Sequence, residues 1–187
     1  IVLQAADLPI GWKGSAYQPG PGGAADQATL VKCVGARNTD GDKVAEANSE
    51  SFALGQANVS SSATSYRSQS DIDADVAVVH SPKLSPCYEQ LLRKELTTSL
   101  PAGAAIEAAT MKITPGSAGG PANVVGTGTG IIKVDANGQK IAVYLSITFI
   151  TGPLIEAEVD TENFGAPVPA ATVKSLVAAV ANRAAKG

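Results

Sequence analysis

The chain has 187 residues, a formal net charge of −3 and a sequence pI near 5.1. An acidic chain lacks the basic face that phosphate backbones require, so nucleic-acid binding is not expected. No apolar run approaches the ~18 residues of a membrane-spanning helix. The length fits a single domain, residues 1–187. Aromatic residues make up only 4%, so the core must consist mainly of Val, Ile, Leu and Ala.

The two cysteines, Cys33 and Cys87, bear on the compartment in which the protein works. Neither a C-x-x-C redox pair nor a second pair for zinc is present in the sequence. The two cysteines could remain as buried free thiols or form a disulfide. We expect the disulfide, which closes a loop of about 54 residues. Such a bond persists only in oxidising compartments, so an extracytoplasmic protein is expected. Because the sequence begins with Ile1 rather than Met, either a processed targeting segment or an artificial boundary precedes it.

The first half of the chain predicts helices and one weak strand. Residues 26 to 34 form a short helix that Asp26 caps and Gly35 ends. Residues 58 to 66 alternate weakly, as a strand anchored by Val59. A second helix begins at Ser70, with Asp73 completing its cap, and ends before Pro82. A third helix takes Ser85 as its N-cap and Pro86 as its first residue, which places Cys87 in the first turn.

From residue 104 onward the pattern changes to that of strands. Asn137-Gly138 is the strongest hairpin signal in the chain, because both positions suit positive φ. The residues after it alternate from Ile141 to Phe149, a Gly152-Pro153 turn follows, and the next strand turns Ile155, Ala157 and Val159 inward. An amphipathic helix closes the chain, with an apolar stripe of Val173, Leu176, Val177 and Val180. Helices that are separate from a run of strands predict an α+β fold, a twisted antiparallel sheet with helices packed on one face.

Three features could mark a site. Glu156, Glu158, Asp160 and Glu162 alternate along one strand; carboxylates in this arrangement diverge, so we expect a solvated sheet face that is available to a cationic partner. Gly126, Gly128 and Gly130 share one face of an extended segment that opens no helix, which argues for a covering helix or loop, or a ligand, and against a phosphate loop. Tyr144 is a further candidate contact. His80 has no nucleophile motif beside it, so no catalytic residue, metal or cofactor is expected.

Two segments carry a resemblance to a known family. "LQAADLPIGW" (3–12) and "SPCYEQLLRKEL" (85–96), with a cysteine in a short helix between them, resemble exported actinobacterial lipoproteins and the extracellular sensor domain of mycobacterial serine/threonine kinase H. The resemblance implies an antiparallel sheet flanked by helices around a cleft, and it matches Cys33 and Cys87 to one of that family's two bridges. The second bridge has no counterpart here. The photosystem-P-like fold of other mycobacterial lipoproteins is similar in architecture.

These observations together predict a non-catalytic binding or sensor-like domain of the cell envelope, secreted or held by an upstream lipid anchor. The expected ligand is a small or lipidic molecule in a cleft between sheet and helices. The alternative is an interaction module that docks another envelope protein through the acidic sheet face.

Overall fold

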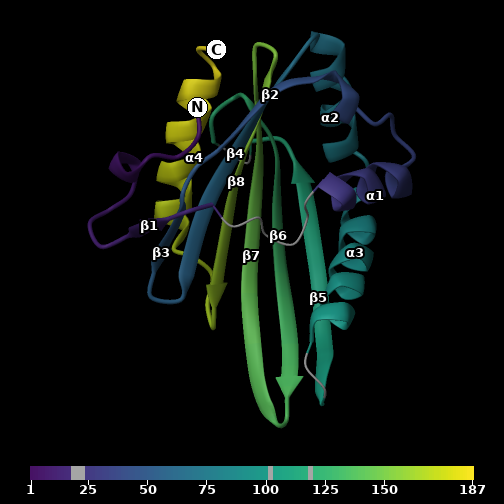
Figure 1. Ribbon diagram of the computed structural model, residues 1–187, viewed down its shortest axis with the longest axis vertical. Coiled ribbons are helices and arrows are strands. Elements are labelled where there is room, and N and C mark those ends of the chain that lie inside the picture. Colours follow the sequence, from purple (N-terminus) through teal and green to yellow (C-terminus); the bar gives the residue numbers. More distant parts are fainter. Residues whose placement is uncertain (18–23, 101–102, 118–119) are drawn as a thin grey trace.

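The computed structural model of the chain describes residues 1–187 except 18–23, 101–102 and 118–119, and for residues 24–26 and 99 it describes the backbone only. Within these residues the protein is an antiparallel sheet of eight strands with four α-helices (Figure 1). The strands are β1 (Lys13–Ser15), β2 (Lys43–Asn48), β3 (Ser51–Leu54), β4 (Ala57–Tyr66), β5 (Ala104–Pro115), β6 (Val124–Ala136), β7 (Gln139–Gly152) and β8 (Ile155–Phe164). The helices are α1 (Ala24–Val34), α2 (Gln69–Val79), α3 (Leu84–Ser99) and α4 (Ala170–Ala184), with two short 3-10 turns at Ala5–Asp7 and Asp40–Asp42.

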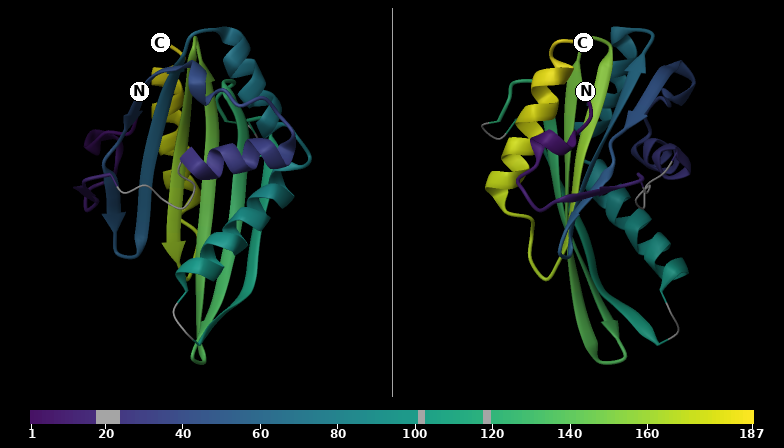
Figure 2. Two further views of the ribbon diagram at one scale, coloured as in Figure 1. Left: turned by 45° about the vertical axis from the view of Figure 1, so that its right-hand side comes forward. Right: turned by 60° about the vertical axis from the view of Figure 1, so that its left-hand side comes forward.

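The strand order is β1-β3-β4-β8-β7-β6-β5, and β2 pairs with the second half of β4 beyond β3. The expected α+β class, with an antiparallel sheet and one disulfide, is therefore confirmed. The helices differ from the expectation in one respect, because they lie on both faces of the sheet. Figure 2 shows α4 on one side and α1, α2 and α3 on the other.

The α4 face contains the larger core. Leu176 and Val180 of α4 are fully buried against Val59, Ile150 and Val159 of the sheet. The period-two alternation of β8 produces this face, because Ile155, Ala157 and Val159 all turn toward α4. Burying aliphatic side chains of this kind contributes roughly 1.5 to 3 kcal/mol each.

The opposite face is covered only in part. Leu92 of α3 packs on Ala109, Met111 and Ile132, at the β5 side of the sheet. A separate cluster of Val34, Val78, Leu84 and Cys87 joins α1, α2 and α3 to one another. The helices on this face thus hold one another together at one side of the sheet.

Arg183 fastens the beginning of the chain to the end of α4. Its guanidinium donates to both carboxylate oxygens of Asp7, at 3.0 and 2.6 Å, and to the carbonyls of Ile1 and Val2, each at 3.1 Å. The hydrogen bonds from Arg183 hold the pKa of Asp7 below its usual value. Leu3 N–H also donates to Ser61 Oγ at 2.7 Å, which draws the segment into the core.

Several expected element ends are shifted. Asn137 and Gly138 have φ of 56° and 87°, which confirms the hairpin. The following turn is centred on Pro153 and Leu154 rather than on Gly152-Pro153, and Leu154 has φ of 56°. Helix α2 is capped by Ser68 together with Asp71 rather than by Ser70, and α3 begins one residue before Ser85. Asp26 lies inside α1, whereas Gly35 ends this helix with φ of 82°, as expected.

Gly152 is required where the end of α4 crosses β7. A Cβ atom at this position would overlap the backbone carbonyl group of Ala184. We therefore expect Gly152→Ala to lower the free energy of unfolding by about 1 to 3 kcal/mol, because backbone cannot yield as a side chain can.

Urea denaturation measures this loss. Gly41→Ala is the matched control, since a Cβ there would meet no atom within 4 Å, and it should change stability by less than about 0.5 kcal/mol. Equal stability of the two variants would contradict this close approach.

Candidate ligand-binding cleft

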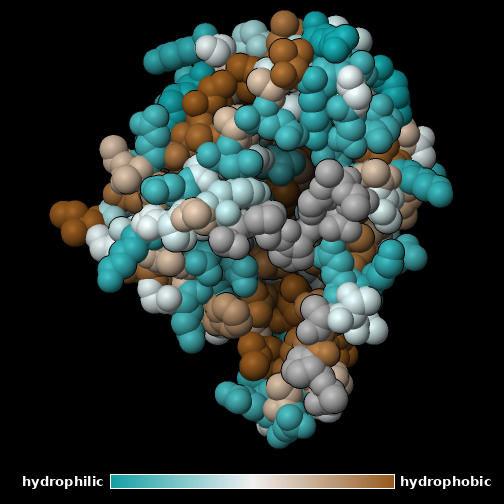
Figure 3. Space-filling model, in the orientation of Figure 1, coloured by the Kyte–Doolittle hydropathy of each residue, from teal (hydrophilic) through white to brown (hydrophobic). Residues whose placement is uncertain are grey.

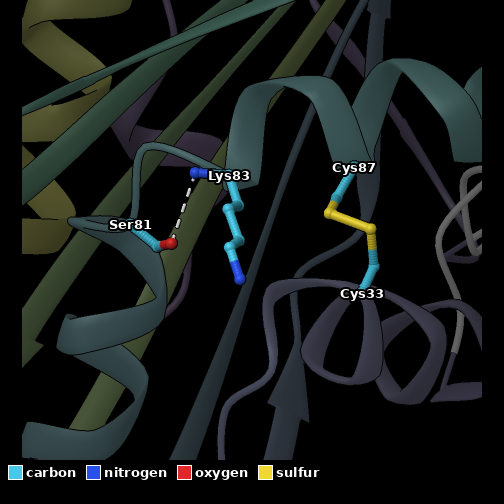
Figure 4. Close-up of a disulfide and its surroundings, with 4 residues drawn as sticks. All are labelled: Cys33, Ser81, Lys83 and Cys87. Carbon is cyan, nitrogen blue, oxygen red and sulfur yellow. Dashed lines mark hydrogen bonds between the residues drawn. A yellow bond between two sulfur atoms is a disulfide. The ribbon is translucent and has the colours of Figure 1, made fainter.

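The expected disulfide is present and joins two helices. Cys33 lies in the last turn of α1 and Cys87 in the first turn of α3, with their Cα atoms 5.9 Å apart (Figure 4). Ser81 Oγ accepts a hydrogen bond from Lys83 N–H at 3.3 Å in the loop that leads into α3. The disulfide therefore fixes α1 to α3 beside the partly covered face of the sheet.

Between these helices and the sheet lies a cavity of about 860 Å³. Its floor comes from β4, β8 and β7, and its sides include Gln27 of α1 and Tyr88 and Leu92 of α3. Figure 3 shows the surface hollowed near the middle of this side, with hydrophilic and hydrophobic residues around the hollow. Ligand pockets typically measure about 300 to 1,000 Å³, so this cleft has the size of a small-molecule site.

The acidic row of β8 lies on the floor of this cleft. Glu156, Glu158, Asp160 and Glu162 point away from α4, as the alternation predicts, and all four line the cavity. The expectation of a solvated sheet face is wrong, because all four residues are only half-exposed. Alternation along β8 defines a face of the strand, whereas the distant helices decide whether that face meets water.

Glu156 is the most strongly affected carboxyl group. Burial, followed by repulsion from the carboxylates of Asp75 and Glu158, raises its pKa to about 9. Its Oε1 atom is buried and has no hydrogen-bond partner. At neutral pH this side chain is therefore uncharged.

The neighbouring acids are affected in the same direction. Burial raises the pKa of Glu158 to about 7, against the opposing attraction of Lys43. Burial and the charge of Glu158 raise the pKa of Asp160 well above its ordinary value. Lys43, the one basic side chain on the described lining, is already paired at 2.9 Å with both Asp40 and Glu46.

Three residues near Glu156 were not predicted from the sequence to belong to the site. Asp75 of α2 accepts from Thr39 Oγ1 at 2.9 and 2.8 Å, which fixes its carboxylate beside the sheet. Burial, followed by the negative charges of Glu156 and Asp75, raises the pKa of Tyr66. Thr39 is buried and polar, and no signal in the sequence connects it with positions 75 and 156.

The glycine row lies on the same side of the sheet, outside the cleft floor. A Cβ at Gly126 would overlap Cγ1 of Val79, so α2 covers this glycine. At Gly128 and Gly130 the nearest atoms belong to neighbouring strands, Ile147 Cγ2 at 2.6 Å and Thr110 O at 2.7 Å. A covering helix thus explains Gly126, and close side chain and backbone packing explains the other two.

Tyr144 faces the opposite side of the sheet. It pairs with Ile131 and lines a separate, mostly apolar cavity of about 520 Å³ beside α4. The structure therefore brings Glu156 and Glu158 together and separates them from Tyr144.

Comparison with protein-family models, curated proteins and solved structures finds no significant match to this chain. Across the described ranges, no helix combines the length and the apolar character needed to cross a bilayer. In the same residues no group of three or more His, Cys, Asp or Glu side chains is arranged to hold a metal ion. The disulfide is compatible with an extracytoplasmic location.

The disulfide makes a measurable contribution to stability. Its 54-residue separation gives a chain-entropy stabilisation of about 4 kcal/mol. We expect the Cys33→Ala, Cys87→Ala double variant to lose up to this amount in urea denaturation, and wild type with reductant to lose as much.

Alkylation without prior reduction should modify neither cysteine of purified wild type. A mass increase for two alkyl groups would show free thiols and contradict the bridge.

The raised pKa of Glu156 predicts a stability that falls with rising pH. The folded state favours the protonated carboxyl, so the stabilisation is complete below the ordinary value of 4.5 and is lost as the pH rises through about 9. Glu156→Gln keeps an uncharged side chain at every pH. Its melting temperature should therefore decline less than that of wild type across this window.

Glu107→Gln is the control, because Glu107 is exposed, is not among the residues that line the cleft, and forms an ion pair with Lys140 at 2.7 Å. This variant should follow the wild-type decline. If the melting temperature of Glu156→Gln fell as steeply with pH as that of wild type, the buried carboxyl group of Glu156 would not be the cause of the decline.

Proposed function

We propose that the protein is a non-catalytic binding domain of the cell envelope that takes a small or lipidic ligand in the cleft between its sheet and helices α1 and α3. The cleft itself carries the proposal. It has a volume of about 860 Å³, and both polar strand residues and the apolar side chains of Leu92, Met111 and Ile147 line it. A mixed lining of this kind, with a few placed polar groups, is typical of small-molecule sites.

The disulfide supports the location and the mechanism of binding. It is compatible with an oxidising compartment, and it fixes α1 against α3 at the side of the cleft. A wall held in this way loses little conformational entropy when a ligand enters, so the fixed geometry favours affinity. The sensor-like role and the lipid-anchored or secreted state remain part of this proposal and follow the family resemblance.

A protein partner is the second candidate, and the observation that favours it is the excess of carboxyl groups over basic groups on the described lining of the cleft. Because Glu156 and Glu158 lie on the cleft floor, a partner would have to insert a narrow basic segment, since a flat surface could not reach these carboxyl groups. Both candidate functions use the same cleft. In the first a small or lipidic molecule occupies it, and in the second a segment of a partner protein does.

Filling the cleft tests the proposal. Ser62 lies opposite Glu158 on β4 and lines the cavity, so the indole of Ser62→Trp would occupy space that a ligand needs. We expect wild type to bind the neutral fluorescent probe N-phenylnaphthylamine, and Ser62→Trp to bind it at least about tenfold more weakly.

Ser70→Trp is the control, because Ser70 is exposed on α2, and it should bind as wild type does. Native mass spectrometry of protein from its own cell envelope should also show a co-purifying molecule that Ser62→Trp lacks. Equal probe binding by all three proteins would refute the assignment of the cleft.

A further inference from the structure

The cleft is divided by polarity across the strands. Its β8 and β4 side presents carboxyl and hydroxyl groups, from Glu156, Glu158, Asp160 and Glu162 and from Ser60, Ser62 and Thr64. Its β7, β5 and α3 side presents apolar side chains, those of Leu145, Ile147, Met111 and Leu92. Strand order makes this division, because β8 separates β4 from β7 in the sheet. A ligand that fills the cavity would therefore meet acid at one side and hydrocarbon at the other.

Among the described residues, the acidic side of the cavity has one counter-charge, and this charge is already paired. Five carboxyl groups line the cavity, the four of β8 and that of Glu46, against the single ammonium of Lys43. Lys43 is paired with Glu46 and with Asp40. Glu158, Asp160 and Glu162 have no ion pair or hydrogen bond with any residue that the structure describes.

Half-buried carboxyl groups without a partner are costly to a fold. Removing a carboxylate from water without a compensating partner costs several kcal/mol, and natural proteins avoid this arrangement unless something else offsets it. Glu156 Oε1 adds a buried oxygen atom without a hydrogen-bond partner. An incoming group that is positively charged and can donate hydrogen bonds would supply what these oxygens lack.

We propose, on the basis of the function proposed above, that the ligand is a cationic amphiphile whose amine or ammonium group lies against the carboxyl groups of β8 and whose hydrocarbon lies on Leu92, Met111, Leu145 and Ile147. The volume of the cavity accommodates both parts of such a molecule. Tyr17 also lines the cavity, and burial, followed by the charges of Asp160 and Glu158, raises its pKa, so an aromatic ring is available near the acidic side.

The titration of the site agrees with this ligand class. Glu158 has a pKa of about 7 and that of Asp160 is raised, so both gain charge as the pH rises, and a bound cation would favour the charged forms. The other titratable groups that face them are Lys43 and Glu46 of β2, Asp75 of α2, Tyr66 of β4, Tyr88 of α3, Tyr17, Glu156 and Glu162. A ligand of fixed charge should bind more tightly above pH 7 than below it.

Calorimetric titration with probes that share one dodecyl chain tests the proposal. The probes are dodecyltrimethylammonium, a fixed cation; dodecyldimethylamine N-oxide, which is uncharged at pH above neutrality; and dodecanoate, an anion. We expect the cation to bind at least about tenfold more tightly than the N-oxide, and dodecanoate to bind most weakly. The preference should increase as the pH rises through the pKa of Glu158, about 7.

Charge removal identifies the groups responsible. Glu158→Gln with Asp160→Asn should reduce cation affinity to that of the N-oxide and leave N-oxide binding unchanged, which also shows that the variant is folded. Asp73→Asn with Glu107→Gln removes the same charge at exposed positions and should retain the preference.

The outcomes separate the two proposals. Equal binding of cation and N-oxide, both lost in Ser62→Trp, would keep the cleft as the site and overturn the ligand class. Tighter binding of dodecanoate would overturn it as well. If no dodecyl probe and no N-phenylnaphthylamine bound, the proposed function would fall together with the ligand class.

Discussion

Four carboxyl groups on one face of β8 determine how the rest of the molecule can pack. Helix α3 closes on the apolar half of the sheet through Leu92 and Met111, but an apolar helix laid over Glu158 and Asp160 would strip them of water at a cost of several kcal/mol. The helices on this face leave a cavity over the acidic row, and this cavity is the cleft.

The other face of the same strand imposes the opposite requirement. Ile155, Ala157 and Val159 need full burial, and α4 provides it at close range, as its approach to Gly152 shows. One strand thus supports a dense core on one side and lines the cleft on the other. The packing of α4 allows the opposite face to remain partly open, since the larger hydrophobic cluster lies mainly on the α4 side of the sheet.

Local chemistry made part of this structure predictable from sequence. Asn137-Gly138, the alternation of β8 and the apolar stripe of α4 each depend on neighbours in the chain, and the two cysteines had few alternatives to pairing. Strand β2 was missed because its residues are exposed almost throughout and show no alternation, and β3 was missed because it has only four residues. The site was only half predicted. The acidic row was recognised, but its enclosure depends on helices much earlier in the chain and on Asp75 of α2, which only the tertiary fold brings beside Glu156.

The clamp made by Arg183 places both ends of the chain at one pole of the molecule, far from the Asn137–Gly138 hairpin (Figure 1). The hollow of Figure 3 opens on the flank between these poles. A linker or fusion partner joined to either end of the chain would therefore lie to one side of the cleft opening and would not cover it. If the domain were held at its termini, a ligand could still enter the cleft from the side and reach the acidic floor, and the domain would not need to reorient.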